Sequence, residues 1–159
     1  MTIALAELIG ADNRIDDLEG TTAERVIGEL IECIGARESF DTATISSIQR
    51  SIVSREREAT TGIGNGIAVP HMKECPHVSE LRVAFGRTRA GLDYGATDGE
   101  PVHVLFLILT PAGKESDHIQ LMKRIVLLGR DKSAMQHLTT ADPLDNLREI
   151  FEEVDAGVS

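Results

Sequence analysis

Residues 60–71 read TTGIGNGIAVPH, and this stretch sets the organisation of the chain. Its closely spaced glycines predict a loop, because neither helices nor strands tolerate glycine well. The apolar residues 67–69 predict a short strand that ends at Pro70 and His71, where the proline ring restricts how the backbone presents the imidazole. The stretch therefore predicts a strand end that carries one histidine beside a loop of small residues.

The glycine loop does not match the phosphate-binding glycine motifs. Gly62-x-Gly64-x-Gly66 is followed by Ile67 where the dinucleotide fingerprint needs a further spaced glycine, and no Gly-Lys-Ser/Thr follows as in a Walker loop. The segment also leads into a strand rather than a helix. We therefore expect no nucleotide site and interpret the loop as a tight turn, as a surface that lets another protein's backbone approach His71, or as both.

Two amphipathic helices are predicted before the loop. Residues 22–34 carry apolar side chains at a helical period, with Thr21 and Glu24 as a capping box and Gly35 as the stop. Residues 41–56 repeat the apolar period and end in a charged run. These helices indicate one apolar face each, which must pack on another layer.

Strand patterns follow the histidine. Residues 81–88 alternate apolar and polar side chains and predict a half-buried strand. Residues 102–110 are almost continuously apolar, which is typical of a strand covered on both faces. Strands and helices are intermingled, so we predict an α/β fold, a mixed β-sheet with helices packed on it, in a single domain over residues 1–159.

Three helical patterns complete the chain. Residues 116–128 form an amphipathic helix for which Ser116 is the expected N-cap. A short helix is expected over residues 132–138. The last helix is predicted to start with Asp142 as its cap and Pro143 in its first turn.

Composition excludes several classes of function. The chain has 159 residues, enough for one core, and a formal net charge of −10, which disfavours nucleic acid and anionic lipid as partners. The longest apolar run, residues 104–109, is far shorter than the roughly 20 residues that span a bilayer. The N-terminal residues lack the basic and apolar regions of a signal peptide. We expect a cytoplasmic protein with no membrane insertion.

Cysteine and histidine are too sparse to predict a metal site. The segment HMKECPH, residues 71–77, places Cys75 between two histidines, but Pro76 interrupts any helix that would align them and no second ligand cluster exists. Cys33 falls within an apolar helical pattern and is interpreted as a small buried hydrophobe. Free thiols fit a reducing compartment.

Two histidines have a context that suggests chemistry. His71 follows Pro70 at a strand end, where it is either functional or merely a polar terminus. His118 lies in the first turn of a predicted helix, where the helix dipole attracts anions and favours a neutral imidazole. The alternative for His118 is a surface histidine near a cap, and His77, His103 and His137 have no comparable context.

Three segments together resemble a known family. Arg55-Glu56, TTGIGNGIAVPH and Asp117-His118-Ile119-Gln120 resemble the enzyme IIA proteins of the bacterial phosphotransferase system, in the fructose, mannitol and nitrogen-regulatory (type 2) branch. The resemblance covers nearly the whole chain and is strongest to the nitrogen-regulatory IIA proteins.

The resemblance implies a phosphohistidine relay without metal or cofactor. In this family the histidine that matches His71 takes a phosphoryl group from a histidine phosphocarrier protein and can pass it to a IIB partner. His118 matches the second active-site histidine and Arg55 the active-site arginine. Such transfer needs a neutral nucleophile whose second ring nitrogen is hydrogen-bonded, for which a backbone carbonyl would serve. His118 would donate to a phosphoryl oxygen, and Arg55 would bond either the phosphoryl group or the acidic surface that faces the partner.

Three functions remain open within this resemblance. We favour a regulator whose phosphorylation state reports nitrogen or carbon status to a target protein. The alternative is a sugar-transport component that passes its phosphoryl group to the IIB domain of a fructose- or mannitol-type permease. A second alternative is a binding module that has lost phosphorylation. It is suggested by Met72, since the family usually has a small residue directly after the histidine.

Overall fold

The computed structural model describes residues 3–158, so residues 1, 2 and 159 of the predicted domain range lie outside the described part. One mixed sheet of six strands has the order β1-β5-β6-β3-β2, with β4 paired to the far part of β6. β5 and β6 are antiparallel, whereas β1, β3 and β4 run parallel to their partners β5 and β6. The strands are β1 Arg14–Ile15, β2 Gly62–Gly64, β3 Ile67–Ala68, β4 His71–Met72, β5 Arg82–Leu92 and β6 Val102–Leu109.

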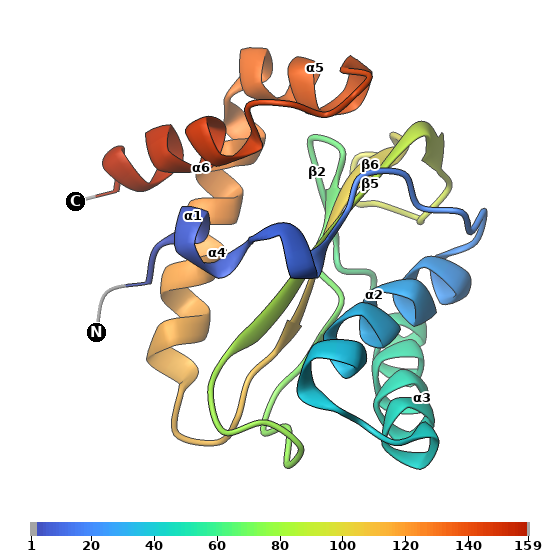
Figure 1. Ribbon diagram of the computed structural model, residues 1–159. Coiled ribbons are helices and arrows are strands. Elements are labelled where there is room, and N and C mark those ends of the chain that lie inside the picture. Colours follow the sequence, from blue (N-terminus) through green and yellow to red (C-terminus); the bar gives the residue numbers. More distant parts are fainter. Residues whose placement is uncertain (1–2, 159) are drawn as a thin grey trace.

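Helices cover both faces of this sheet, as Figure 1 shows. Helices α2 and α3 pack on one face, while α1, α4, α5 and α6 pack on the other. Their bounds are α1 Leu5–Leu8, α2 Ala23–Glu38, α3 Thr42–Glu58, α4 Glu115–Arg130, α5 Lys132–Thr140 and α6 Leu147–Ala156. The predicted α/β class, with helices on a mixed sheet in one domain, is confirmed. No helix within residues 3–158 combines the length and the apolar character that crossing a membrane requires.

The buried strand β6 separates two apolar cores. Val104, Phe106 and Ile108 belong to the core beneath α4–α6, whereas the alternate residues 105, 107 and 109 belong to the core beneath α2 and α3. Successive side chains of a strand point to opposite faces, so a strand covered on both sides must be apolar throughout. The prediction for residues 102–110 is confirmed, with the strand ending at Leu109.

Several predicted helix ends are wrong by a few residues. Helix α2 is capped by Thr22, whose side chain accepts from the Arg25 N–H, rather than by Thr21. It also continues through Gly35 to Glu38, and a side chain at Gly35 would crowd Ile45 of α3, so this glycine permits close helix packing and does not end the helix. Helix α4 begins one residue before Ser116, with Lys114 at the N-cap position.

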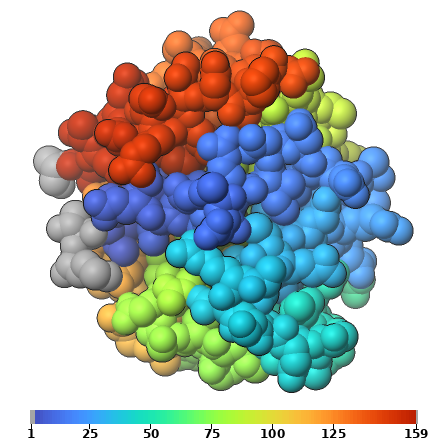
Figure 2. All heavy atoms as spheres, viewed as in Figure 1, coloured from blue at the N-terminus to red at the C-terminus, as the bar shows by residue number. Residues whose placement is uncertain are grey.

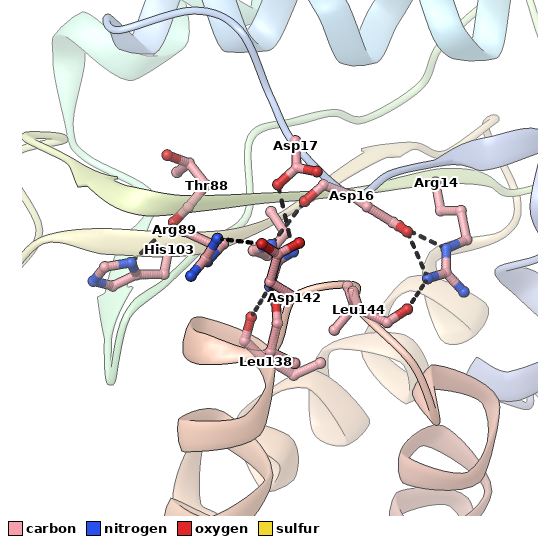
Figure 3. A network of polar contacts seen from close by, with 11 residues as sticks. Arg14, Asp16, Asp17, Thr88, Arg89, His103, Leu138, Asp142 and Leu144 are labelled. Carbon is pink, nitrogen blue, oxygen red and sulfur yellow. Dashed lines mark hydrogen bonds and ion pairs between the residues drawn. The ribbon is translucent and has the colours of Figure 1, made fainter.

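The start of the last helix is also corrected. Helix α6 begins at Leu147 after Asn146, which adopts a left-handed conformation, and Asp142 does not cap it. Asp142 instead pairs with Arg89 on β5 at 3.0 Å (Figure 3). The polar contacts of the segment before α6 are therefore made with the sheet, and the helix starts later.

The glycine-rich stretch forms a hairpin. Gly62–Gly64 is a strand that pairs antiparallel with β3, and Asn65 and Gly66 both have positive φ at the turn between them. Asn-Gly is a preferred pair for two-residue hairpin turns of this kind, a signal that the loop interpretation missed. The turn lies beside His103 at the start of β6, whereas His71 pairs with Ile108 near its end. At about 3.3 Å per residue the two sites are more than roughly 13 Å apart, so the turn does not open a path to His71.

A polar network joins the N-terminal segment to the α5–α6 connection. Arg87 is fully buried and donates to the carbonyls of Asp16, Leu138 and Ala141. Arg14 adds two bonds to the Asp16 carboxylate and one to the Leu144 carbonyl (Figure 3). The surface view shows the N-terminal segment lying between the C-terminal helices and α2 (Figure 2). This network closes the molecule at the end of the sheet away from His71.

Candidate functional site

His71 is held by its own strand with one ring nitrogen engaged. It pairs with Ile108 of β6, which belongs to the core beneath α4, and its side chain is partly exposed. The Nδ1 atom lies 2.7 Å from the Val69 carbonyl oxygen. A carbonyl can only accept, so a neutral ring carries its proton on Nδ1 and leaves the lone pair on Nε2. This is the kind of partner that the sequence argument required.

The structure brings the second predicted histidine next to the first. The rings of His71 and His118 are 5.3 Å apart between centroids and inclined by 55°. His118 is the fourth residue of α4 and is only 8% exposed. Its backbone N–H already donates to the Lys114 carbonyl, so the free N–H groups of this helix end belong to the preceding residues.

The surroundings of His118 favour its uncharged form. Burial is the main cause that lowers the pKa of His118 to about 4, and its electrostatic coupling to His71 and Lys73 adds to the effect. Near neutral pH its imidazole is therefore uncharged and presents one donor and one acceptor nitrogen. The ring can therefore form hydrogen bonds but carries no positive charge.

The structure adds residues to the site that the sequence argument did not identify. A cavity of about 240 Å³ opens beside His118, between the start of α4 and the segment after β4. Thr110 lies at its base, 2% exposed, with Oγ1 at 2.9 Å from His118 Nδ1. Lys73 contributes the cationic side chain. Their signals were present but weak: Lys73 is two residues after His71, and Thr110 is a polar residue at the end of an apolar strand. The lining residues are Lys73, Glu74, Thr110, Glu115, His118 and Ile119.

Arg55 is placed near the helix end but not in contact with the histidines. It lies exposed in the last turn of α3, and its Nη1 donates to the Ala59 carbonyl at 2.9 Å. Within residues 3–158 it makes no hydrogen bond to His71 or His118. The structure thus brings together two of the three predicted site residues, His71 and His118. The side chain of the third, Arg55, is exposed and bonded to its own helix end.

Met72 points away from the face that His71 presents. Its strand partner is Leu109, and its side chain packs against the core beneath α2 and α3. Alternation along β4 puts His71 and Met72 on opposite faces of the sheet. A bulky residue at this position therefore does not cover the imidazole.

The cysteines and the remaining histidines lie outside this arrangement. Cys75 is buried in the core beneath α2 and α3, and Cys33 is only half-buried, contrary to its interpretation as a core residue. In the described part of the chain, no group of three or more His, Cys, Asp or Glu side chains is placed to hold a metal ion. His103 bonds the Thr88 carbonyl and His137 contacts Asp145, so each has a partner of its own.

The fold, a mixed sheet covered by helices on both faces, brings two histidines of the chain together at its edge. Residues 7–154 match the family described as "Phosphoenolpyruvate-dependent sugar phosphotransferase system, EIIA 2". The chain belongs to this family of phosphotransfer components, as the sequence resemblance predicted.

Relatives come from both branches of that family. The "Nitrogen regulatory protein" of Pseudomonas aeruginosa is 29% identical over 157 residues, covering 98% of this chain and 99% of that protein. The "PTS system fructose-specific EIIABC component" of Bacillus subtilis is 29% identical over 139 residues, covering 87% of this chain. This chain spans only 21% of the length of that second relative.

The fold agrees with a solved structure from the regulatory branch. The nitrogen regulatory protein IIA-Ntr of Neisseria meningitidis superposes with a TM-score of 0.77 at 26% sequence identity. The superposition covers 92% of this chain and 98% of that one.

Proposed function

We propose that this protein is a phosphocarrier that accepts a phosphoryl group on Nε2 of His71 from a histidine phosphocarrier protein. The observation that carries the proposal is the bond between His71 Nδ1 and the Val69 carbonyl beside a second, neutral histidine. It leaves an unprotonated nitrogen on a partly exposed ring, which is the state a nucleophile needs.

The proposed transfer needs no proton to leave the site. The bond from phosphorus to the donor imidazole breaks, and a bond from phosphorus to His71 Nε2 forms in line with it. The donor ring, protonated on its second nitrogen, leaves as a neutral imidazole with the electron pair. The His71 ring keeps its Nδ1 proton against the Val69 carbonyl and takes over the positive charge. Reversal of the same step passes the group to an acceptor.

The neighbouring side chains would stabilise the charge on the transferred group. His118 donates a hydrogen bond to an equatorial oxygen, and Lys73 supplies a positive charge from the rim of the cavity. Arg55 reaches the phosphoryl group or the partner protein only after giving up its bond to the Ala59 carbonyl. An exposed arginine on a helix end has the reach and the freedom for such a change.

Mapping the phosphoryl group tests this proposal. The protein is incubated with phosphoenolpyruvate, enzyme I and the histidine phosphocarrier protein, and the product is read by intact mass and by peptide mapping. We expect one acid-labile phosphoryl group on His71 and none in His71→Gln. His103→Gln is the matched control, because His103 also bonds a carbonyl through Nδ1 but has no second histidine beside it. Label on another residue, or continued labelling of His71→Gln, would refute the assignment.

For the biological role we propose regulation of a cytoplasmic target protein in response to nitrogen or carbon status. The match to the nitrogen regulatory protein, which extends over nearly all of both chains, supports this role. The second candidate is transfer to a IIB domain, which the name of the Bacillus subtilis relative suggests by joining IIA with B and C parts. A purified IIB protein from the same organism separates the two: rapid transfer from phospho-His71 would favour transport.

A further inference from the structure

A buried hydroxyl holds the second histidine of the site. Thr110 Oγ1 lies 2.9 Å from His118 Nδ1, and both residues are at most 8% exposed. Either atom can carry the proton of this hydrogen bond. The two arrangements give His118 opposite properties at Nε2, which is a donor in one and an acceptor in the other.

The other contacts of Thr110 decide between these arrangements. Within residues 3–158 the hydroxyl makes one hydrogen bond, and its partner is His118 Nδ1. If Nδ1–H donated to it, the hydroxyl proton of this buried residue would have no acceptor among the described residues, which is costly. If the hydroxyl donates to Nδ1, both groups are satisfied.

The Nε2 side of His118 is free to meet a ligand. No buried side-chain nitrogen or oxygen in the described residues lacks a hydrogen-bond partner. His118 Nε2 has no hydrogen-bond partner among these residues, so this atom is not fully buried. The His118 ring lines the cavity to which Lys73 also contributes. When the Thr110 hydroxyl donates to Nδ1, the ring proton of neutral His118 is on Nε2, the nitrogen that is open to the cavity side.

Backbone hydrogen bonds fix Thr110 to the segment that carries His71. Its N–H donates to the Met72 carbonyl at 3.0 Å, and its carbonyl accepts from the Cys75 N–H at 2.9 Å. The hydroxyl is thus held in register with β4 while it bonds a side chain of α4. Thr110 therefore sets the position of the His118 ring relative to β4, the strand that carries His71.

We propose that Thr110 is a positioning residue that fixes the tautomer of His118, with Oγ1–H donating to Nδ1 and the ring proton on Nε2. The inference rests on the proposed function of His71 as phosphoryl acceptor. His71 has the opposite tautomer, with its proton on Nδ1 and its lone pair on Nε2. The pair therefore presents one nucleophilic nitrogen and one N–H donor to the same phosphoryl group.

This arrangement matters because the transferred group is anionic. As the donor P–N bond breaks and the bond to His71 Nε2 forms, the equatorial oxygens need donors that are already in place. His118 with Nε2–H supplies one without moving a proton. The other tautomer would direct a lone pair at those oxygens and oppose the transfer.

The tautomers are measured directly by long-range proton–nitrogen NMR on the full chain labelled with 15N-histidine, near neutral pH and without any phosphodonor. We expect Nε2–H at His118 and Nδ1–H at His71. A wild-type protein with Nδ1–H at His118 overturns the proposal, whether or not His71 accepts a phosphoryl group. Failure of His71 to accept one would instead refute the proposed function and leave the tautomer result standing.

Two substitutions then connect the tautomer to the rate. Thr110→Val removes the hydroxyl and keeps the shape of the side chain, and Thr110→Ser keeps the hydroxyl. With phosphoramidate as a small phosphodonor, we expect Thr110→Val to mix the His118 tautomers and slow labelling of His71 about tenfold. Thr110→Ser is expected to restore both. An unchanged tautomer and rate in Thr110→Val overturns the proposal.

The chain offers a matched control for the loss of a buried hydroxyl. Thr88 is 8% exposed on β5, and His103 Nδ1 bonds its backbone carbonyl rather than its hydroxyl (Figure 3). Thr88→Val therefore removes a hydroxyl beside a histidine without removing that histidine's hydrogen bond. We expect it to leave the tautomers and the labelling rate as in the wild type, and equal slowing in both variants would overturn the specific role of Thr110.

Discussion

At the scale of single residues, the two site histidines are held by different kinds of contact. His71 Nδ1 lies against the carbonyl of Val69, two residues earlier in the chain, whereas burial first, and then the nearby His71 and Lys73, keep His118 uncharged near neutral pH. The sequence predicted that a carbonyl would hold His71 and that the start of a helix would favour neutral His118. The burial of His118 and its contact with Thr110 arise from the packing of α4 against the sheet, which no local pattern encodes.

Burial of His118 makes stability depend on pH. Its pKa is lowered from 6.5 to about 4 in the folded protein, so between these values the unfolded chain binds a proton that the folded chain does not. Stability from this group is therefore full above pH 6.5 and falls as the pH drops toward 4, by at most about 3 kcal/mol. Urea unfolding of the wild type and His118→Gln, at neutral and acidic pH, measures the difference. Parallel pH profiles for the two proteins would contradict the prediction.

Arg55 makes no hydrogen bond to His71 or His118 among the described residues, so its part in phosphoryl transfer can be tested by substitution. Its one hydrogen bond is to the Ala59 carbonyl on an exposed helix end, so Arg55→Ala should lower the free energy of unfolding by only about 0.5 kcal/mol. We expect slower phosphoryl transfer between the carrier protein and His71, read by single-turnover kinetics. Arg57, exposed at the same helix end and facing Glu24, provides the control variant Arg57→Ala. Equal rates in the wild type and both variants would remove Arg55 from the mechanism.

At the scale of elements, α3 and the hairpin are joined by a carboxylate. Glu56 accepts hydrogen bonds from the Thr61 N–H, the Thr61 hydroxyl and the Tyr94 hydroxyl. Thr61 in turn accepts the Val69 N–H through its carbonyl, and the Val69 carbonyl holds His71. The end of α3 is thus connected to His71 through Thr61, the residue just before the first strand of the hairpin.

Removal of this carboxylate should loosen the hairpin. Glu56→Ala leaves the Tyr94 and Thr61 donors without their acceptor, for which we expect a loss of about 2–4 kcal/mol in unfolding free energy. Tyr94→Phe removes one donor and keeps the ring, so we expect about 1 kcal/mol. Burial raises the pKa of the Tyr94 hydroxyl, so it remains a donor through the ordinary pH range. Chemical denaturation measures both losses, and a larger loss in Tyr94→Phe than in Glu56→Ala would contradict this order.

The elements themselves show what local sequence can predict. Strand β6 and the helices α2 to α5 follow from their apolar periods, because each buries a face that its own pattern defines. The short strands β1 and β4 have only two residues each and exist through pairing with β5 and β6. The start of α6 was misplaced because Asp142 has a tertiary partner, Arg89, that no cap pattern shows.

At the scale of the whole molecule, the site and the main structural network lie at opposite ends of the sheet. His71 pairs near the end of β6, while Arg87 on β5 pairs with Val104 near its start. Arg87 satisfies carbonyls from the N-terminal segment and from the end of α5, and among residues 3–158 its one ion-pair partner is the exposed Asp17 at 3.4 Å. The acidic net charge, by contrast, could be predicted directly from composition. Composition could not predict that a basic residue, Lys73, lines the cavity beside His118.

Because the Arg87 network and the histidine pair lie at opposite ends of the sheet, we expect that substitutions of Arg87 lower the free energy of unfolding without changing the rate of phosphoryl uptake. Arg87→Ala leaves one buried and two partly buried carbonyls without this donor and opens space beneath α5, so we expect a loss of about 3–5 kcal/mol. Arg87→Met refills part of the space and should recover a fraction of that loss. Arg89→Ala removes an exposed ion pair with Asp142 and should cost less than about 1 kcal/mol.

The readout combines thermal unfolding with phosphoryl uptake at a temperature where every variant is folded. Because the network does not touch His71, His118 or Thr110, the rate per folded molecule should equal that of the wild type in all three variants, while the melting temperatures fall in the order Arg89→Ala, Arg87→Met, Arg87→Ala. A folded Arg87 variant that labels His71 more slowly would show instead that the two ends of the sheet are coupled through β5 and β6, the strand pair that they share.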